Sequence, residues 1–183
     1  MQDVRLSRNR IARLQTIEYL RSFIAGRLGW ASMNSLLIIS GAFGLFRRSR
    51  VLEIGGYMTG RGEFKKDTVG EDMELVVRLV RRMRESGSKY RIRYAATANC
   101  WTEVPEDLGS LYKQRDRWHR GLVRTLWTHR RMMFNPRYGS VGLVAFPYFF
   151  LFEMLGPFVE ILGYVIVEDG GRRYDMPVLV NLF

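Results

Sequence analysis

Residues 114–118 read Gln-Arg-Asp-Arg-Trp, and the triplet Gly70-Glu71-Asp72 precedes them, with Gln114 standing 42 positions after Asp72. Three fixed residues within five (Gln, Arg and Trp) arise by chance in a chain of this length on the order of one time in a hundred. A Glu-Asp pair upstream at this distance makes a coincidence rarer still. These two segments therefore carry the most specific chemical information in the chain.

Three segments around these motifs have the periodicity of amphipathic helices. Residues 10–28 carry apolar side chains at helical spacing with arginines around them, and a second helix is predicted from Asp72 to the stop at Gly87. A third is predicted over residues 106–131, with Gly121 as a point where it could break. Arginines beside tryptophans in this third helix are typical of a membrane–water interface.

Two short segments between these helices have the pattern of strands. Residues 36–39 form a continuous apolar run, and residues 90–94 alternate between arginine and an apolar or aromatic side chain. The sequence therefore predicts an α/β fold.

Residues 138–167 are the most apolar part of the chain and are long enough to cross a bilayer as a helix. Glu153 and Glu160 interrupt the run seven positions apart, so they would share one helix face that points to protein or a polar channel. The basic flank lies only on the N-terminal side, which favours a membrane span. The alternative is a hairpin buried in the core of a soluble protein.

Composition limits the classes of function. The chain has 183 residues, enough for one domain with a core, and its net charge of +11 indicates an anionic partner. The single cysteine, Cys100, excludes an intrachain disulfide and fits a packed thiol in a reducing compartment. His119 and His129 lack metal-ligand spacing. A nucleic-acid-binding protein is disfavoured, because the charge is spread over amphipathic faces and no nucleic-acid motif occurs.

The motif residues suit group transfer from a phosphate ester. A carboxylate such as Asp72, at the start of a helix, is either an N-cap or a general base that takes a proton from an attacking hydroxyl. Arg117 offers bidentate donors to phosphate oxygens, Gln114 offers a neutral donor, and Trp118 offers a flat apolar face on which a sugar ring can stack.

In its order of elements and motifs, the chain over roughly residues 10–165 resembles the second half of the GT-A domain in membrane-bound family 2 glycosyltransferases of the polysaccharide-synthase type. That group makes cellulose, chitin, hyaluronan and poly-N-acetylglucosamine. The resemblance implies that Asp72 is the catalytic base, with Gly70 in place of the family's threonine, and that Glu71 orders the loop. It places Gln114 and Arg117 near the pyrophosphate and Trp118 under the acceptor sugar.

A second segment matches the family less specifically. Residues 40–48, Ser-Gly-Ala-Phe-Gly-Leu-Phe-Arg-Arg, are similar to the segment that lines the family's acceptor site. The resemblance implies that Ser40 and Gly41 approach the sugar, and that Arg47 or Arg48 holds phosphate or a carboxylate such as Glu71. Without the family, the same residues read equally well as a glycine-rich strand end followed by solvated arginines.

The family's Asp-x-Asp motif, which binds Mg²⁺ or Mn²⁺ and the donor diphosphate, does not occur before these segments. The resemblance therefore implies that the metal ligands lie in an N-terminal half that another part of the protein or a partner subunit provides. We expect residues 1–105 to be the acceptor-side half of a partial GT-A domain, residues 106–137 an interface helix, and residues 138–183 a truncated transmembrane region.

The function implied is that of an inverting glycosyltransferase. It would move a sugar from a nucleotide-sugar donor, expected to be a UDP-sugar, to a growing glycan acceptor. It would act at the inner (plasma) membrane in contact with lipid, with its catalytic part in the cytoplasm and without nucleic acid. The alternative is a non-catalytic membrane-associated module derived from such a synthase. The sequence names neither the sugar nor the linkage.

Overall fold

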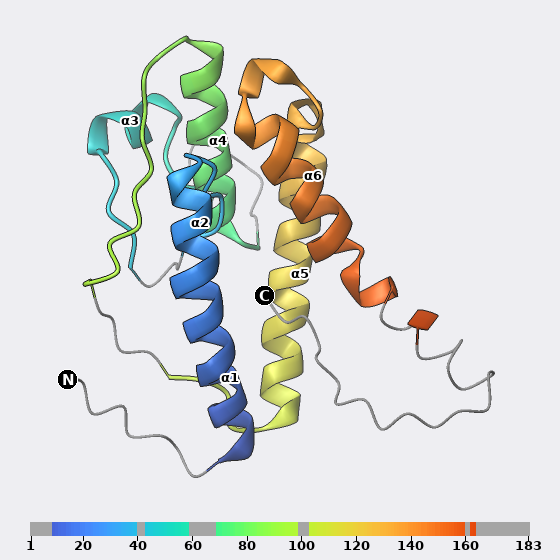
Figure 1. Cartoon of the computed structure of the whole chain (residues 1–183). Coiled ribbons are helices and arrows are strands. Elements are labelled where there is room, and N and C mark those ends of the chain that lie inside the picture. The colour runs from blue at the N-terminus through green and yellow to red at the C-terminus, as the bar shows by residue number, and fades with distance from the viewer. Residues whose placement is uncertain (1–8, 40–42, 59–68, 99–102, 160–161, 164–183) are drawn as a thin grey trace.

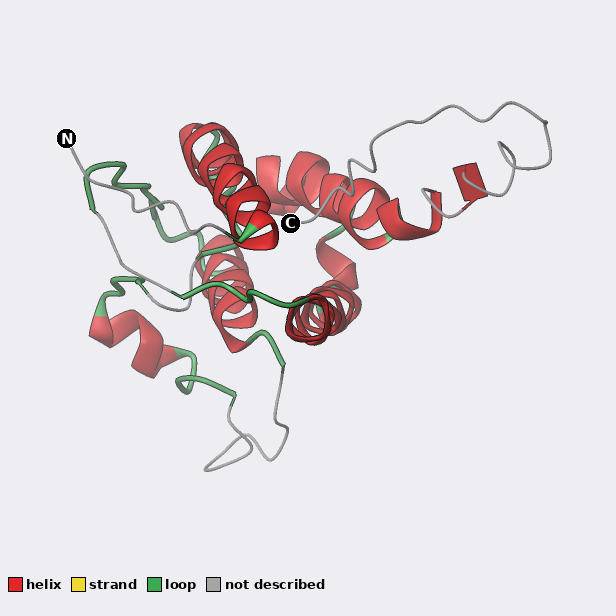
Figure 2. Cartoon of the chain, turned by 90° about the horizontal axis from the view of Figure 1, so that it is seen from below, coloured by secondary structure: helices red, strands yellow, loops and turns green. Residues whose placement is uncertain are grey.

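The computed structural model describes residues 9–39, 43–58, 69–98, 103–159 and 162–163, and within these ranges it is helical (Figures 1 and 2). Its longest elements are α4 (Glu71–Glu85) and α5 (Leu108–Thr128), joined by shorter helices before and after them. The placement of the functional motifs depends on how α5 contacts its neighbours.

The first element is a rod made of α1 (Arg10–Leu20), a π-helical segment η1 (Arg21–Gly26) and α2 (Arg27–Ser32) (Figure 1). The side chain of Asn9 caps its start, accepting the backbone N–H groups of Ile11 and Ala12. Asn34 ends the rod with a φ of +55°, a left-handed conformation that asparagine tolerates. The predicted helix over residues 10–28 is therefore confirmed.

Helix α4 packs against α5 and forms the centre of the core (Figure 1). Its apolar positions recur on one face, as the sequence predicts, and Gly87 follows its end in a left-handed conformation. Helix α5 continues through Gly121 without a break. The buried core residues of the two helices and their neighbours are Leu37, Met73, Val76, Val77, Val80, Leu122, Leu126 and Met132.

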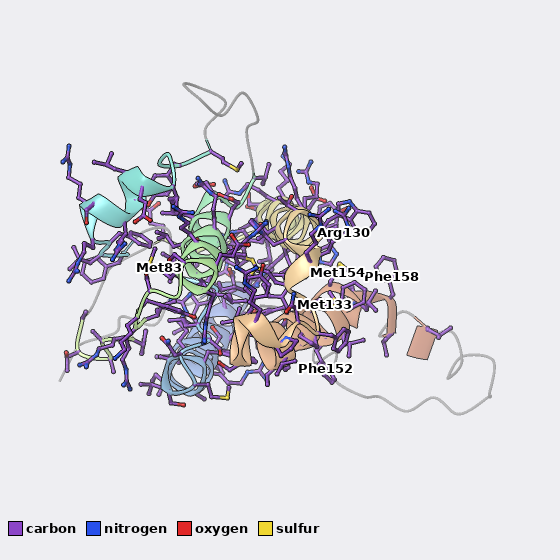
Figure 3. All side chains as sticks on the ribbon, turned by 90° about the horizontal axis from the view of Figure 1, so that it is seen from above. Met83, Arg130, Met133, Phe152, Met154 and Phe158 are labelled. Atoms are coloured by element: carbon purple, nitrogen blue, oxygen red, sulfur yellow. The ribbon has the colours of Figure 1, made fainter. Side chains whose placement is uncertain are left out.

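After α5 the chain turns back in short pieces, which are η2 (Arg130–Met132), η3 (Pro136–Tyr138), η4 (Val141–Ala145), α6 (Phe146–Tyr148) and η5 (Phe149–Met154). Val141, Ala145 and Phe146 are fully buried against the core. Figure 3 shows Met154 on the side of η5 that faces α5, with Phe152 on the opposite side. On the side of α2, Trp30 packs edge-on against Tyr148, with ring centroids 5.0 Å apart.

Helix α3 (Arg48–Glu53) is tied to α4 by one arginine. Arg78 is bound to the buried carboxylate of Glu74 at 2.8 Å, and it donates to the backbone carbonyls of Ile54 and Gly56. His129, which follows α5, lies 3.5 Å from the same carboxylate. Glu74 is therefore the centre of a buried polar network that links α3, α4 and the end of α5.

The two predicted strands are wrong for the part of the chain that the structure describes. Residues 36–39 and 90–94 are extended, but neither is assigned as a strand. Asn34 holds the second segment by donating to the carbonyl of Tyr90 at 3.2 Å and accepting the N–H of Ile92 at 2.9 Å. A strand needs a ladder of backbone bonds, and here one side chain provides the bonds instead.

The predicted transmembrane region is not supported either. No helix among the described residues is long and apolar enough to cross a membrane. The helical path from Val141 bends at Leu155 and resumes at Gly156, and its first half is buried in the core, which agrees with the alternative of a core hairpin. Glu153 faces protein as predicted, near Tyr148 and Arg21. Glu160 and Cys100 lie outside the described residues.

The apolar stripe of the first rod faces away from this core. Its members are between 42% and 68% exposed, and they are Leu14, Ile17, Leu20, Ile24 and Leu28. The amphipathic pattern therefore predicts the helix correctly but marks a face that no other described element covers.

Candidate functional site

A contact between two glycines brings the two motifs together. Gly70, with a φ of +92°, ends the turn before α4, and its backbone lies directly against Gly121 in the middle of α5. A Cβ at Gly121 would stand 3.1 Å from the Cα of Gly70 and would overlap the carbonyl oxygen of Val69. Only glycine allows this approach. The turn that carries Glu71 and Asp72 therefore rests on the helix that carries the Gln-Arg-Asp-Arg-Trp segment.

The three motif residues of α5 lie shortly before this contact. At about 1.5 Å of rise per residue, Trp118 and Arg117 are one turn from Gly121, or roughly 5 Å along the axis, and Gln114 is about 10 Å away. Asp72 begins its helix two positions after Gly70. Along their own helices, all four predicted residues therefore lie within about two turns of the Gly70–Gly121 contact, and their roles in one site stay a prediction.

Asp72 is a half-buried carboxyl at the start of α4. Its Oδ1 accepts the backbone N–H of Met73 at 2.8 Å. Burial raises the pKa of Asp72 above its usual value, the bond from Met73 opposes this, and the charge of Glu71 adds to it. A carboxylate whose charged form is destabilised holds a proton more readily, as a general base requires. Glu71 itself is exposed.

Arg27 of α2 also faces this site, and the sequence gave no signal for it. Burial lowers the pKa of Arg27, while Tyr94 and Asp72 both act to raise it. The arginine is therefore the cation that approaches Asp72 from the first rod. Its place in an amphipathic helix with several other arginines conceals it in the sequence, because only the tertiary fold distinguishes it from its neighbours.

The side chains of the α5 motif point in different directions. Arg117 is exposed, while Gln114 and Trp118 are partly buried, and the Oε1 of Gln114 has no hydrogen-bond partner among the described residues. Trp118 lies under the guanidinium of Arg115 at 4.9 Å and beside Tyr19 of α1 at 6.5 Å. The motif therefore presents a free cation to solvent and an indole ring to the first rod.

The predicted residues of the 40–48 segment are not brought into this group. Ser40 and Gly41 lie outside the described residues. Arg47 caps the start of α3 and Arg48 is its first residue, and both are exposed. Neither forms an ion pair with Glu71 among the described residues, so their contact with phosphate or carboxylate stays a prediction.

A resident metal does not fit the described part of the chain. No group of three or more His, Cys, Asp or Glu side chains lies close enough there to hold an ion. His129 is buried beside Glu74 and His119 lies within α5, far along the helix from any second histidine. The Mg²⁺ or Mn²⁺ expected from the family resemblance, with ligands in an N-terminal half, stays a prediction.

A pocket of about 470 Å³ opens between α3 and α4, away from the predicted residues. Its carboxylates are already engaged, since Glu85 pairs with Arg81 at 2.8 Å and Glu53 with Arg82 at 3.3 Å. Charge in this pocket is therefore largely compensated within the chain, and the pocket does not compete with the motif site for an anionic ligand.

Comparison with known proteins gives a consistent result. The family model described as glycosyl transferase family group 2 matches residues 2–167. The chain is 30% identical over 158 residues to the poly-beta-1,6-N-acetyl-D-glucosamine synthase of Staphylococcus aureus (strain COL), covering 86% of this chain and 33% of that protein. It is 31% identical over 122 residues to the synthase of the same name from Staphylococcus epidermidis, covering 64% and 26%. The chain spans about a third of the length of these relatives. No solved structure gives a significant match.

Proposed function

The chain belongs to the glycosyl transferase family group 2, and from this premise we propose that it is the acceptor-side part of an inverting glycosyltransferase that extends a polysaccharide. The observation that carries the proposal is the Gly70–Gly121 contact, which places a half-buried carboxyl beside the helix of the Gln-Arg-Asp-Arg-Trp segment. The names of the relatives suggest N-acetylglucosamine as the sugar. The donor we propose, from the family resemblance, is a nucleotide-sugar, expected to be a UDP-sugar.

Asp72 is the proposed base. Its carboxylate takes the proton of an acceptor hydroxyl while the hydroxyl oxygen bonds to the anomeric carbon of the donor. The bond from that carbon to the diphosphate breaks in the same displacement, so the configuration at the carbon inverts. The raised pKa of Asp72 supports this role, because it improves proton transfer to the carboxylate.

Arg117 and Gln114 are proposed to act on the leaving group. The departing diphosphate gains negative charge as the sugar leaves, and fixed donors that meet this charge lower the barrier. Arg117 is exposed and one turn from Gly121, so its guanidinium is free to reach phosphate oxygens. The Nε2 group of Gln114 is the donor proposed for a phosphate oxygen, whereas its Oε1, which has no partner among the described residues, is an acceptor.

Trp118 is proposed as the platform for the acceptor sugar. Its indole is the flat apolar surface of the motif and suits the apolar face of a hexose, with Arg115 over the ring and Tyr19 beside it. A divalent metal would neutralise the diphosphate of the donor, but the described residues hold no site for it. We therefore assign its ligands to the rest of the protein.

We also propose that the exposed stripe of the first rod rests on an anionic bilayer. Leu14, Ile17 and Ile24 are more than half exposed, and Arg10 and Arg13 flank them. An apolar stripe bordered by arginines is the pattern of a helix in the headgroup region. Flotation of the chain with vesicles containing phosphatidylserine tests this, and binding that Ile17→Glu does not weaken would contradict it.

The main experiment measures transfer from radiolabelled UDP-sugars in membranes that carry the natural full-length protein, with Mg²⁺ or Mn²⁺ present. We expect transfer from one sugar of the panel, its loss by at least 100-fold in Asp72→Asn, and unchanged donor binding. Asp116→Asn is the matched control, because it makes the same chemical change in α5, where Asp116 pairs with Arg120 at the surface. Near-normal turnover in Asp72→Asn would overturn the base assignment. Protein that is present but transfers no sugar would favour a non-catalytic module.

A further inference from the structure

Helices α1 and α5 meet along a polar seam, of which the proposed reaction uses only Trp118. Gln15, Glu18 and Tyr19 face it from α1, and Arg115 and Trp118 face it from α5. Gln15 is 2% exposed, which is unusual for a glutamine, and its Oε1 has no hydrogen-bond partner among the described residues. A polar seam of this kind needs an explanation beyond packing.

The centre of the seam is a buried ion pair. Glu18 Oε2 lies 2.7 Å from Arg115 Nη2, and the two side chains are only 13% and 10% exposed. Burial raises the pKa of Glu18, and Arg115 opposes that rise. Replacing a buried pair of this kind with apolar side chains is often neutral or stabilising, so stability alone is a weak reason for the pair.

Arg115 connects the pair to a predicted site residue. Its guanidinium carbon stands 4.9 Å from the centre of the Trp118 ring, in the geometry of a cation–π contact. Tyr19, next to Glu18 in sequence, lies 6.5 Å from the same ring at an angle of 35°. The indole is therefore fixed on one face by a guanidinium whose own orientation is set by Glu18.

The position of α1 along this seam is also fixed. Gln15 Nε2 donates to the carbonyl of Pro105 at 2.7 Å, and Asn9 Nδ2 donates to the carbonyl of Glu106 at 2.7 Å. Both acceptors lie just before α5 begins. These bonds hold Glu18 at the height of Arg115, so the ion pair has one register available to it.

We propose that Glu18 is a positioning residue for glycosyl transfer, which acts through Arg115 to hold the indole ring of Trp118 in the orientation that receives the acceptor sugar. The proposal rests on the acceptor role of Trp118 given above. Other ion pairs of the long helices, such as Arg120–Asp116 and Arg81–Glu85, lie four residues apart on one helix and are more exposed. The Glu18–Arg115 pair differs because it joins two helices and because Arg115 also lies over the ring of Trp118.

The test is a set of variants of the natural full-length protein in membranes, assayed with N-acetylglucosamine oligosaccharides as acceptor. Glu18→Gln is expected to raise the KM for acceptor about 10-fold and to change the KM for nucleotide-sugar by less than about 2-fold. Arg115→Lys keeps the charge but loses the flat stacking group, and we expect the same effect from it. Asp116→Asn, which breaks a surface pair in the same helix, is the control.

A charge exchange separates positioning from simple stabilisation. The double variant Glu18→Arg/Arg115→Glu restores an ion pair between the helices but places a carboxylate against the indole. We expect it to recover the melting temperature lost in the single variants without recovering the KM for acceptor. Full recovery of the KM would show a structural pair only and would overturn the proposal.

An optical measurement keeps the inference separate from the proposed function. The difference between the emission spectra of the protein and of its Trp118→Phe variant isolates the emission of Trp118. Glu18→Gln is expected to shift this difference spectrum to longer wavelength, because the ring loses its fixed cover. An unchanged spectrum overturns the positioning role even if no sugar is transferred. A shifted spectrum with unchanged acceptor dependence in Trp118→Ala overturns the acceptor platform instead.

Discussion

Helix α5 touches its two neighbours in opposite ways. Toward the turn before α4 the contact is backbone against backbone, with Gly121 pressed on Gly70 and no side chain between them. Toward α1 the contact runs through long polar side chains, with Glu18 bound to Arg115 over the ring of Trp118. The contact between the two glycines has no side chain that can move, whereas the contact with α1 depends on side-chain rotamers.

The difference between these two contacts suggests that each has its own role within one site. The proposed base needs a fixed distance from the helix that holds the leaving group, and a backbone contact provides it. The proposed acceptor platform is a side chain, and its orientation depends on the Glu18–Arg115 pair and not on the backbone. Experiments on each contact can therefore test whether the two contacts have these different roles.

The largest effect is expected at the backbone contact between Gly70 and Gly121. Gly121→Val puts a branched side chain into the backbone of Val69 and Gly70, so the turn before α4 must move. We expect transfer to fall by more than 100-fold and the free energy of unfolding to fall by about 3 kcal/mol. Steady-state kinetics and thermal unfolding measure the two losses.

Gly29→Ala is the matched control, because it also lies in a helix but a Cβ there meets nothing within 4 Å. Alanine is the better helix former, so we expect this variant to be slightly more stable. If Gly121→Val and Gly29→Ala behaved alike, the backbone contact would not set the geometry of the site.

The next effect concerns the polar network beside the same contact. Burial pushes the pKa of Glu74 up, but its contacts with His129 and Arg78 outweigh burial and hold the pKa below its usual value. Glu74→Gln leaves a buried arginine without its carboxylate, and we expect a loss of about 3 kcal/mol in thermal unfolding. Asp116→Asn, at the surface, is expected to lose less than about 1 kcal/mol. Equal losses would show that the network is not part of the α4–α5 contact.

A third effect is expected from pH. The folded pKa of Asp72 lies above its unfolded value, chiefly through burial, so the carboxyl favours folding below the unfolded pKa and loses that contribution as pH rises through the folded one. At neutral pH, Asp72→Asn is therefore expected to raise the melting temperature while it abolishes transfer. In the unaltered protein, transfer is expected to decline on acidification at a pH above that of an ordinary aspartate. A melting temperature lowered by Asp72→Asn would contradict the direction of the shift.

The smallest effect is expected on the outer side of α1. Ile17→Ser changes a side chain that is 64% exposed, so we expect a change within about 0.5 kcal/mol in the unfolding of the isolated chain. Leu37→Ala, in the core, is expected to lose 2 kcal/mol or more, about the usual loss for a buried leucine. A large effect of Ile17→Ser on unfolding would mean that protein, not lipid, covers the stripe.

Helix periodicity predicted α1, α4 and α5 because each has one apolar face, and this pattern is local. It did not predict the break-up of residues 138–167, because the π-helical segments η4 and η5 respond to packing on Trp30 and α5. The two expected strands failed for a related reason: alternation describes a strand's faces but cannot provide its partner. In each case the tertiary contact decided the outcome.

The sequence predicted the motif residues of the candidate site but not the residues that position them. Asp72, Gln114, Arg117 and Trp118 stand out by type and spacing, and their chemical roles stay predictions until they are measured. Glu18 gave no signal, because one glutamate in an amphipathic helix looks ordinary, and Gly121 was interpreted as a possible helix break and not as a contact. Their importance comes from what lies opposite them in space.

Asn34 is a residue whose deamidation would alter a tertiary contact. One amide holds the extended segment after α4 through two bonds of opposite sense, donating to Tyr90 and accepting from Ile92. Deamidation replaces the donor with a second acceptor oxygen, which then faces the carbonyl of Tyr90 and repels it. A change of a single functional group would thus remove one of the two bonds between Asn34 and this segment, while Arg84 and the core still hold Tyr90.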